Sequence, residues 1–210
     1  MRTTALSGYF RRYLFFLAVI LTAVSCKQTK SDHFPDSAKN IEKTVLIQPF
    51  DDLSKAKVQY VSNEIRKVYP NIRVLPPIPM ITESYYAPRN RFRADTIIRK
   101  LRNHAKSNEV ILGLTSKDIS VTKGKFADFG VMGLGYRPGN ACVASNFRVK
   151  NDEQFFKIAI HELGHTQGLH HCPEKTCFMR DAEGGNPTDE LKDFCPKCKS
   201  FLKTKNWKFS

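Results

Sequence analysis

The 210-residue sequence has no internal repeat and no low-complexity segment, which excludes a repeat array and a largely disordered chain. It also lacks a long apolar run: the stretch from Tyr13 to Val24 is shorter than the about 20 residues that a transmembrane helix needs. Acidic residues are few, since 20 Asp and Glu stand against 34 Lys and Arg, for a net charge of +14. With 41% hydrophobic and 11% aromatic residues, the chain can form one globular domain with a real core.

The N-terminal segment has the features of a signal peptide. Three arginines precede the apolar run, and small residues then lead to Cys26 in the sequence Leu-Thr-Ala-Val-Ser-Cys. This ending resembles a bacterial lipoprotein signal with Cys26 as the lipidated residue, although Ala23 stands where Leu is usual; an ordinary cleaved signal or a free thiol is the alternative. We therefore expect a signal peptide over residues 1–25, a flexible tether over 26–43 and one folded domain over 44–210. The protein would be exported and held on a membrane, facing the periplasm or the cell surface.

Removal of the three arginines in residues 1–25, which contain no acids, leaves a mature chain with a net charge of +11. This charge could favour anionic lipid surfaces or acidic peptides, or belong to a solvated helix face. Nucleic acid is not an expected partner, because no recognised nucleic-acid-binding module is present. The densest group of basic residues comprises Arg89, Arg91, Arg93, Arg99, Lys100 and Arg102.

The most informative segment is residues 161–171, which read His-Glu-Leu-Gly-His-Thr-Gln-Gly-Leu-His-His and fit the pattern HExxHxxGxxH. His161 and His165 are four residues apart, so on a helix their imidazoles project from one face within reach of a single ion. Gly168 can end that helix in a left-handed conformation, and the reversed chain can bring back His171 as a third ligand. Three neutral histidines leave the fourth position of a tetrahedral zinc to water, and Glu162 is placed to take the proton of that water.

The residues before this motif support a helix. Phe155, Phe156, Ala159 and Ile160 have roughly helical spacing, which predicts a buried amphipathic helix that begins near Asn151. A bare HExxH also occurs by chance on solvated helices, but the added glycine and third histidine make that reading much weaker here. His170 does not fit the ligand spacing, and we expect it to be exposed or to lie behind the ligands.

Four cysteines follow the motif within 27 residues. Two pairs at this separation resemble a structural zinc site with four thiolates. Two disulfides or buried thiols are the alternative, and a local disulfide between Cys195 and Cys198 would suit an oxidising compartment. Cys142 is expected to be a small buried residue in a strand. The four cysteines after the motif are Cys172, Cys177, Cys195 and Cys198.

The succession HExxHxxGxxHC, CxM and CxxC between residues 155 and 200 resembles the archaemetzincins, the two-zinc branch of the metzincin peptidases. The resemblance implies a catalytic zinc on His161, His165 and His171, with Glu162 as the general base. It also implies a structural zinc on the four cysteines, and it makes Met179 the Met-turn methionine, which packs beneath the catalytic metal without binding it. The implied function is zinc-dependent hydrolysis of peptides or proteins by a monomer. A zinc-stabilised binding or structural lipoprotein with little peptidase activity is the alternative.

Hydrophobic patterning predicts alternating strands and helices before the motif helix. Together with the resemblance, it indicates a metzincin-like α/β fold: a twisted mixed sheet, packed helices, and a cleft between a sheet edge and the HExxH helix. The segment 129–136 is either an edge strand that binds an extended peptide or an ordinary hairpin strand joined to 141–148 by residues 137–140. The other expected elements are strands at 44–50, 72–75 and 109–115 and helices at 53–68 and 91–106.

Overall fold

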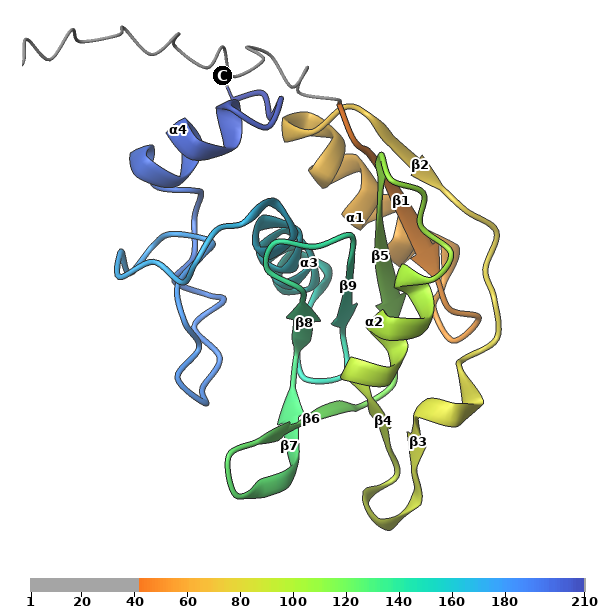
Figure 1. The fold of residues 1–210 in the computed structure, drawn as a ribbon. Helices are drawn as coiled ribbons and strands as arrows, with labels where there is room; N and C mark the ends of the chain where they lie inside the picture. Colours follow the sequence, from red (N-terminus) through yellow and green to blue (C-terminus); the bar gives the residue numbers. More distant parts are fainter. Residues whose placement is uncertain (1–41, 210) are drawn as a thin grey trace, which may run out of the picture. The chain divides into compact units, whose positions relative to one another are not determined.

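The structure is a computed structural model that describes residues 42–209. The expected signal peptide, Cys26 and the tether before residue 42 lie outside the described residues. Within the described range, the chain forms a mixed α/β fold with a five-stranded sheet, a four-stranded sheet and four α-helices (Figure 1). No helix in this range is long and apolar enough to cross a membrane.

The larger sheet has the strand order β2-β1-β5-β9-β8. Its first four strands are parallel, and β8 is antiparallel to β9 at the edge of the sheet. The central strand β5 is buried at every residue, as expected for a parallel strand that is covered on both faces. The strands are β1 (Thr44–Pro49), β2 (Ile72–Val74), β5 (Glu109–Thr115), β8 (Gly133–Gly135) and β9 (Ala141–Ser145).

Helices cover both faces of this sheet, and the alternation of side chains along β1 shows the two layers (Figure 1). Val45 and Ile47 point into a core shared with α1 (Lys55–Val68) and α3 (Asp152–Gln167). Leu46, between them, points to the opposite face, where α2 (Ala94–Arg102) packs. The fourth helix, α4 (Pro196–Lys203), lies near the C-terminus and joins the first core through Leu202.

The smaller sheet has the order β3-β4-β6-β7 and lies near the β8 end of the larger one (Figure 1). Partly buried ion pairs stabilise it, because Arg91 on β4 lies 2.8 Å from Asp118 and 2.8 Å from Asp128. Its strands are β3 (Tyr85–Tyr86), β4 (Arg91–Arg93), β6 (Ile119–Lys123) and β7 (Phe126–Val131), with short 3-10 helices η1 (Thr82–Ser84) and η2 (Ala87–Arg89) around β3.

Three details of the predicted elements were wrong. Residues 91–93 form strand β4, and the helix predicted from 91 begins only at Ala94, because these residues pair with strand neighbours instead of with the following turn. The segment 129–136 is divided between β7 and β8, so there are two sheets where one was expected. Strand β9 ends at Ser145, whose hydroxyl donates to Lys117 O and accepts from the Phe147 N–H, so the chain turns there.

The group of basic residues around α2 is mostly paired with acids. Lys100 lies 2.6 Å from Glu83, and Arg93 lies 3.5 Å from Asp95. Arg102 instead lies over the ring of Tyr136, 5.4 Å from its centroid. Much of the charge that the sequence gathers here is therefore balanced locally.

Candidate metal centre and cleft

Helix α3 carries the HExxH segment, and its ends are well defined. The side chain of Asn151 accepts a hydrogen bond from Gln154 N at 2.9 Å. Two acidic residues in the first turn also stabilise the helix, because their negative charges lie near the positive end of the helix dipole. The helix ends at Gly168, whose φ of +112° is disfavoured for residues with a Cβ. The chain reverses at this glycine and brings His171 back towards the helix.

Three imidazoles gather at this reversal. The ligand atoms of His161, His165 and His171 lie within 4.8 Å of one another. Nδ1 of His161 lies 2.6 Å from Phe178 O, and Nδ1 of His165 lies 2.7 Å from Leu169 O. Because a carbonyl oxygen only accepts, each Nδ1 carries the hydrogen and each Nε2 keeps a lone pair for a metal ion.

The protonation of the cluster also suits a cation. Burial lowers the pKa of His161 to about 3 and that of His165 to about 4, so both rings are neutral at pH 7. Neutral imidazole is the form that binds metal. This donor set, three imidazole nitrogens in reach of one centre, fits zinc. His170, as expected, is exposed and does not belong to the cluster.

Glu162 is buried beside the cluster, and burial raises its pKa to about 8. A cation held by the neighbouring histidines would favour the ionised carboxylate. Strand β8 passes very close to it: a Cβ on Gly133 would lie 2.5 Å from Glu162 Oε1, and one on Gly135 would lie 2.8 Å from Glu162 O. The absence of a Cβ at both positions therefore allows β8 to approach α3.

Gly133 and Gly135 were missed when the sequence was considered alone. They are two residues apart, so they share one face of the strand. A glycine at every second position of a predicted strand is a signal of close backbone approach. That signal could have identified β8 as the strand that contacts the motif helix.

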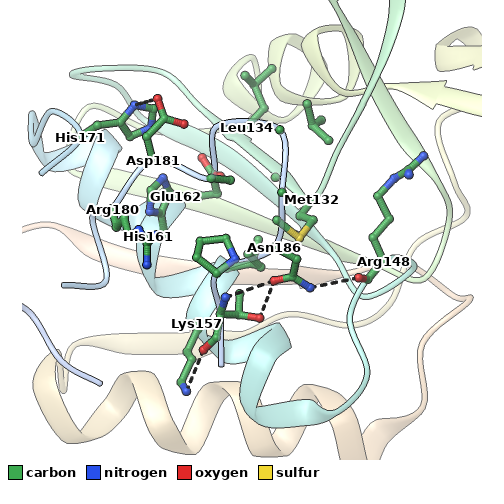
Figure 2. Close-up of a pocket in the computed structure, with 18 of the residues that line it drawn as sticks. Met132, Leu134, Arg148, Lys157, His161, Glu162, His171, Arg180, Asp181 and Asn186 are labelled. Carbon is green, nitrogen blue, oxygen red and sulfur yellow. Dashed lines mark hydrogen bonds and ion pairs between the residues drawn. The ribbon is translucent and has the colours of Figure 1, made fainter. Parts of the chain in front are cut away.

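The histidines and Glu162 open into a cleft of about 640 Å³ (Figure 2). Strands β7 and β8 form one wall, helix α3 contributes the histidines, and the irregular segment 180–191 forms the other wall. Met132 and Leu134 give the strand wall an apolar lining. The cleft between a sheet edge and the motif helix was expected, and it is present.

The irregular wall is tied to helix α3 by polar contacts (Figure 2). Lys157, one turn before His161, donates to Thr188 O at 3.1 Å and lies 2.6 Å from Glu153. The Thr188 N–H and hydroxyl both donate to Asn186 Oδ1, at 3.2 and 2.5 Å. These contacts give an otherwise irregular segment a fixed position, and no periodic pattern in the sequence indicates them.

The four cysteines form a second cluster near the C-terminus. Their sulfur atoms lie within 4.8 Å of one another, and the shortest recorded separation is 3.7 Å between Cys172 and Cys195. The sulfur of Cys177 accepts hydrogen bonds from Met179 N at 3.4 Å and Cys195 N at 3.3 Å. No disulfide joins any of the described cysteines, so the expected alternative of a Cys195–Cys198 disulfide is not present.

Cys177 has its pKa raised to about 11 by burial, so this group is a neutral thiol unless a cation displaces the proton. Four cysteine sulfurs within 4.8 Å of one another fit zinc. Cys142 does not belong to this cluster: it is fully buried in β9, as the sequence predicts.

Met179 joins the two clusters. It is fully buried, and a Cβ on Gly164 of helix α3 would lie 2.5 Å from its sulfur. Its carbonyl oxygen accepts a hydrogen bond from Cys172 N at 2.8 Å. The methionine thus packs against the motif helix while its backbone holds the residue that follows His171.

A family model described as peptidase family M54 matches residues 38–204, a range that includes both clusters. The archaemetzincin of Archaeoglobus fulgidus is 31% identical over 167 residues, which cover 76% of this chain and 98% of that protein. The archaemetzincin of Methanopyrus kandleri is 31% identical over 126 residues, which cover 57% of this chain and 70% of that protein.

Solved structures match as well. The crystal structure of Archaeoglobus fulgidus archaemetzincin in complex with malonate aligns with a TM-score of 0.65 at 30% identity, covering 75% of this chain and 99% of that one. The Methanopyrus kandleri structure aligns with a TM-score of 0.67 at 23% identity, covering 81% and 98%. The mixed α/β fold described above is therefore the fold of these proteins.

Proposed function

The chain belongs to peptidase family M54, the archaemetzincins, and on this basis we propose that the three clustered histidines hold its catalytic zinc, with Glu162 as the general base. The protein is a zinc metallopeptidase, and its substrates are peptides or proteins. One observation supports the assignment most strongly: the ligand atoms of three imidazoles converge within 4.8 Å at a cleft that also contains a buried carboxyl group.

Each residue has a distinct part in the reaction. When bound to the histidines, zinc supplies a Lewis acid that polarises the scissile carbonyl and activates the attacking water. The Glu162 carboxylate takes a proton from that water and delivers it to the nitrogen of the leaving amine.

Strand β8 is placed to orient the substrate. It is the edge strand of the larger sheet, and within the described residues it pairs only with β9. The free side of an edge strand offers backbone N–H and C=O groups to an extended peptide. We propose that the segment 129–136, through its β8 portion, binds substrate by strand addition along the cleft.

The cysteine cluster is proposed to hold a second zinc, with a structural role. All four sulfurs belong to the protein, so a tetrahedral ion there has no position left for water or substrate. We propose Met179 as the Met-turn residue; its close packing against Gly164 of helix α3 and its position outside both ligand sets support this.

The proposed organisation of the whole chain follows from its N-terminal sequence. Residues 1–25 would be a signal peptide, 26–43 a tether anchored through lipid on Cys26, and 44–210 the catalytic domain. The enzyme would then act as an exported, membrane-anchored monomer. The motif of arginines, apolar run and small residues before Cys26 supports this proposal.

Two substitutions test the catalytic assignment. Glu162→Ala should abolish cleavage of a peptide selected from a library while native mass spectrometry still counts two zinc ions. His165→Ala should lose activity together with one zinc ion. Glu174→Ala, an exposed carboxylate three residues after His171, is the control and should behave as the original protein. Undiminished turnover by zinc-loaded Glu162→Ala would exclude Glu162 as the base.

A further inference from the structure

The three clustered histidines are held in two different ways. Nδ1 of His161 and of His165 faces a backbone carbonyl oxygen. Nδ1 of His171 instead lies 3.1 Å from Oδ2 of Asp181, and Figure 2 shows this ring and carboxylate facing each other at the cleft. His171 therefore depends on a side chain for an orientation that the other two histidines obtain from the backbone.

His171 also has less packing around it than its partners. His171 is exposed, with 45% of its side chain accessible, whereas His165 is buried and lies within helix α3. A half-exposed imidazole can rotate about its side-chain bonds unless a hydrogen bond prevents it. Among the described residues, Asp181 makes the one polar contact with the His171 ring, whose other ring contacts are with His161 and His165.

Asp181 is itself fixed. Its Oδ1 accepts a hydrogen bond from Glu183 N at 3.0 Å, which leaves Oδ2 for His171. Glu183 and Gly184 both have positive φ, 49° and 85°, so the chain turns sharply around the carboxylate. One oxygen is thus used to position the side chain and the other to contact the histidine.

We propose that Asp181 is the positioning residue for His171. It accepts the Nδ1 hydrogen, which leaves the lone pair on Nε2, and its negative charge makes that nitrogen a stronger ligand. The proposal rests on the proposed function in one respect, namely that His171 binds zinc. Asp181 lies ten residues beyond the HExxHxxGxxH motif in an irregular segment, so no ligand pattern in the sequence includes it.

The test measures zinc affinity, independently of peptide cleavage. Full-length protein is equilibrated in buffers of fixed free zinc, and native mass spectrometry counts the ions that remain at each concentration. Asp181→Ala should weaken the histidine site by about 10- to 100-fold, the usual effect of removing a carboxylate behind a zinc-bound histidine. The zinc on the four cysteines should be retained.

Two further variants serve as controls. Asp189→Ala removes an exposed carboxylate of the same irregular segment that contacts Gln154 and no clustered histidine, and it should leave both affinities unchanged. Asp181→Asn keeps the size of the side chain and an oxygen for Glu183 N, so its zinc affinity can be measured even if Asp181→Ala folds poorly. We expect the zinc affinity of Asp181→Asn to lie between that of the original protein and that of Asp181→Ala.

A double-mutant cycle decides whether Asp181 acts through His171. In a His171→Ala background, Asp181→Ala should change the remaining zinc affinity by less than about twofold, because the ring on which it acts is absent. An equal loss in both backgrounds would show a general effect of charge and would overturn the proposal. So would an unchanged affinity of the Asp181→Ala single variant.

Failure of this inference can be separated from failure of the proposed function. If the original protein binds two zinc ions and cleaves peptide, but Asp181→Ala retains full affinity, only the role of Asp181 is wrong. If the His165→Ala substitution removes no zinc from the protein, the histidines are not the site and the proposed function itself fails.

Discussion

Replacement of Gly133 by alanine should strongly lower the turnover of the enzyme without removing its zinc. A Cβ at this position on β8 would lie 2.5 Å from Oε1 and 2.6 Å from Cγ of Glu162. Rotation of the Glu162 carboxylate alone could relieve the contact with Oε1. It cannot relieve the contact with Glu162 Cγ, because this atom is bonded directly to the Cβ of Glu162. The side chain of Glu162, or the strand, must therefore move.

The size of the effect follows from these distances. Non-bonded carbon atoms pack at about 3.5 to 4.0 Å, so Cγ must retreat by about 1 Å. A displacement of the Glu162 carboxylate by about 1 Å should lower turnover about 100-fold. This factor corresponds to a loss of about 2.7 kcal/mol of transition-state stabilisation. The crowding should also lower the free energy of unfolding by about 1 to 3 kcal/mol.

The assay compares kcat/KM for one library-selected peptide with zinc content and denaturant unfolding of the same samples. Gly185→Ala is the matched control for crowding, because its Cβ would meet only Ala182 O, at an ordinary 3.4 Å, and both zinc content and the free energy of unfolding should be unchanged. If Gly133→Ala retains its zinc and full turnover, then the close approach of β8 does not position Glu162, and the reasoning is wrong.

Three other substitutions address the remaining parts of the chain. Cys195→Ser should lose one of two zinc ions in native mass spectrometry and unfold at lower denaturant, because a structural metal contributes folding free energy; one zinc together with two disulfides in the original protein would contradict the four-thiolate site. Met179→Ala should lower the free energy of unfolding by about 2 to 5 kcal/mol, measured by urea titration, since it empties space beneath Gly164; a loss below 1 kcal/mol would mean that the site collapses freely. Cys26→Ala should move the protein from the membrane fraction to the soluble fraction, and an original protein without incorporated fatty acid would count against the lipid anchor.

The parts of the site that the sequence predicts are those encoded locally. The spacing of His161 and His165 needs only helical geometry, and the reversal at Gly168 needs only its positive φ. The central strand at 109–115 was also predicted with its observed bounds, because a continuous apolar run is typical of a buried parallel strand. Each of these features can be recognised within about ten residues.

The parts that escaped prediction depend on partners distant in the chain. Arg91 lies in a stretch with helical spacing, but its ion pairs with Asp118 and Asp128 belong to a sheet whose strands are far apart in the sequence. Asp181 becomes meaningful only when the chain reversal places His171 beside it. Sequence patterns relate residues that are close along the chain. These contacts join segments that only the tertiary fold brings together, so no pattern indicates them.

Because Cys172 directly follows His171, folding of the cysteine cluster also fixes the third histidine of the proposed catalytic site. Adjacent Cα atoms are about 3.8 Å apart, so the cysteine cluster constrains the location of the histidine next to it. Two members of that cluster, Cys195 and Cys198, lie 24 and 27 residues after His171, so the ribosome adds them later than the histidine. A nascent chain therefore has its HExxH helix complete well before it can fix the third histidine. The third histidine would therefore be fixed only after Cys198 has been added and the cysteine cluster has folded.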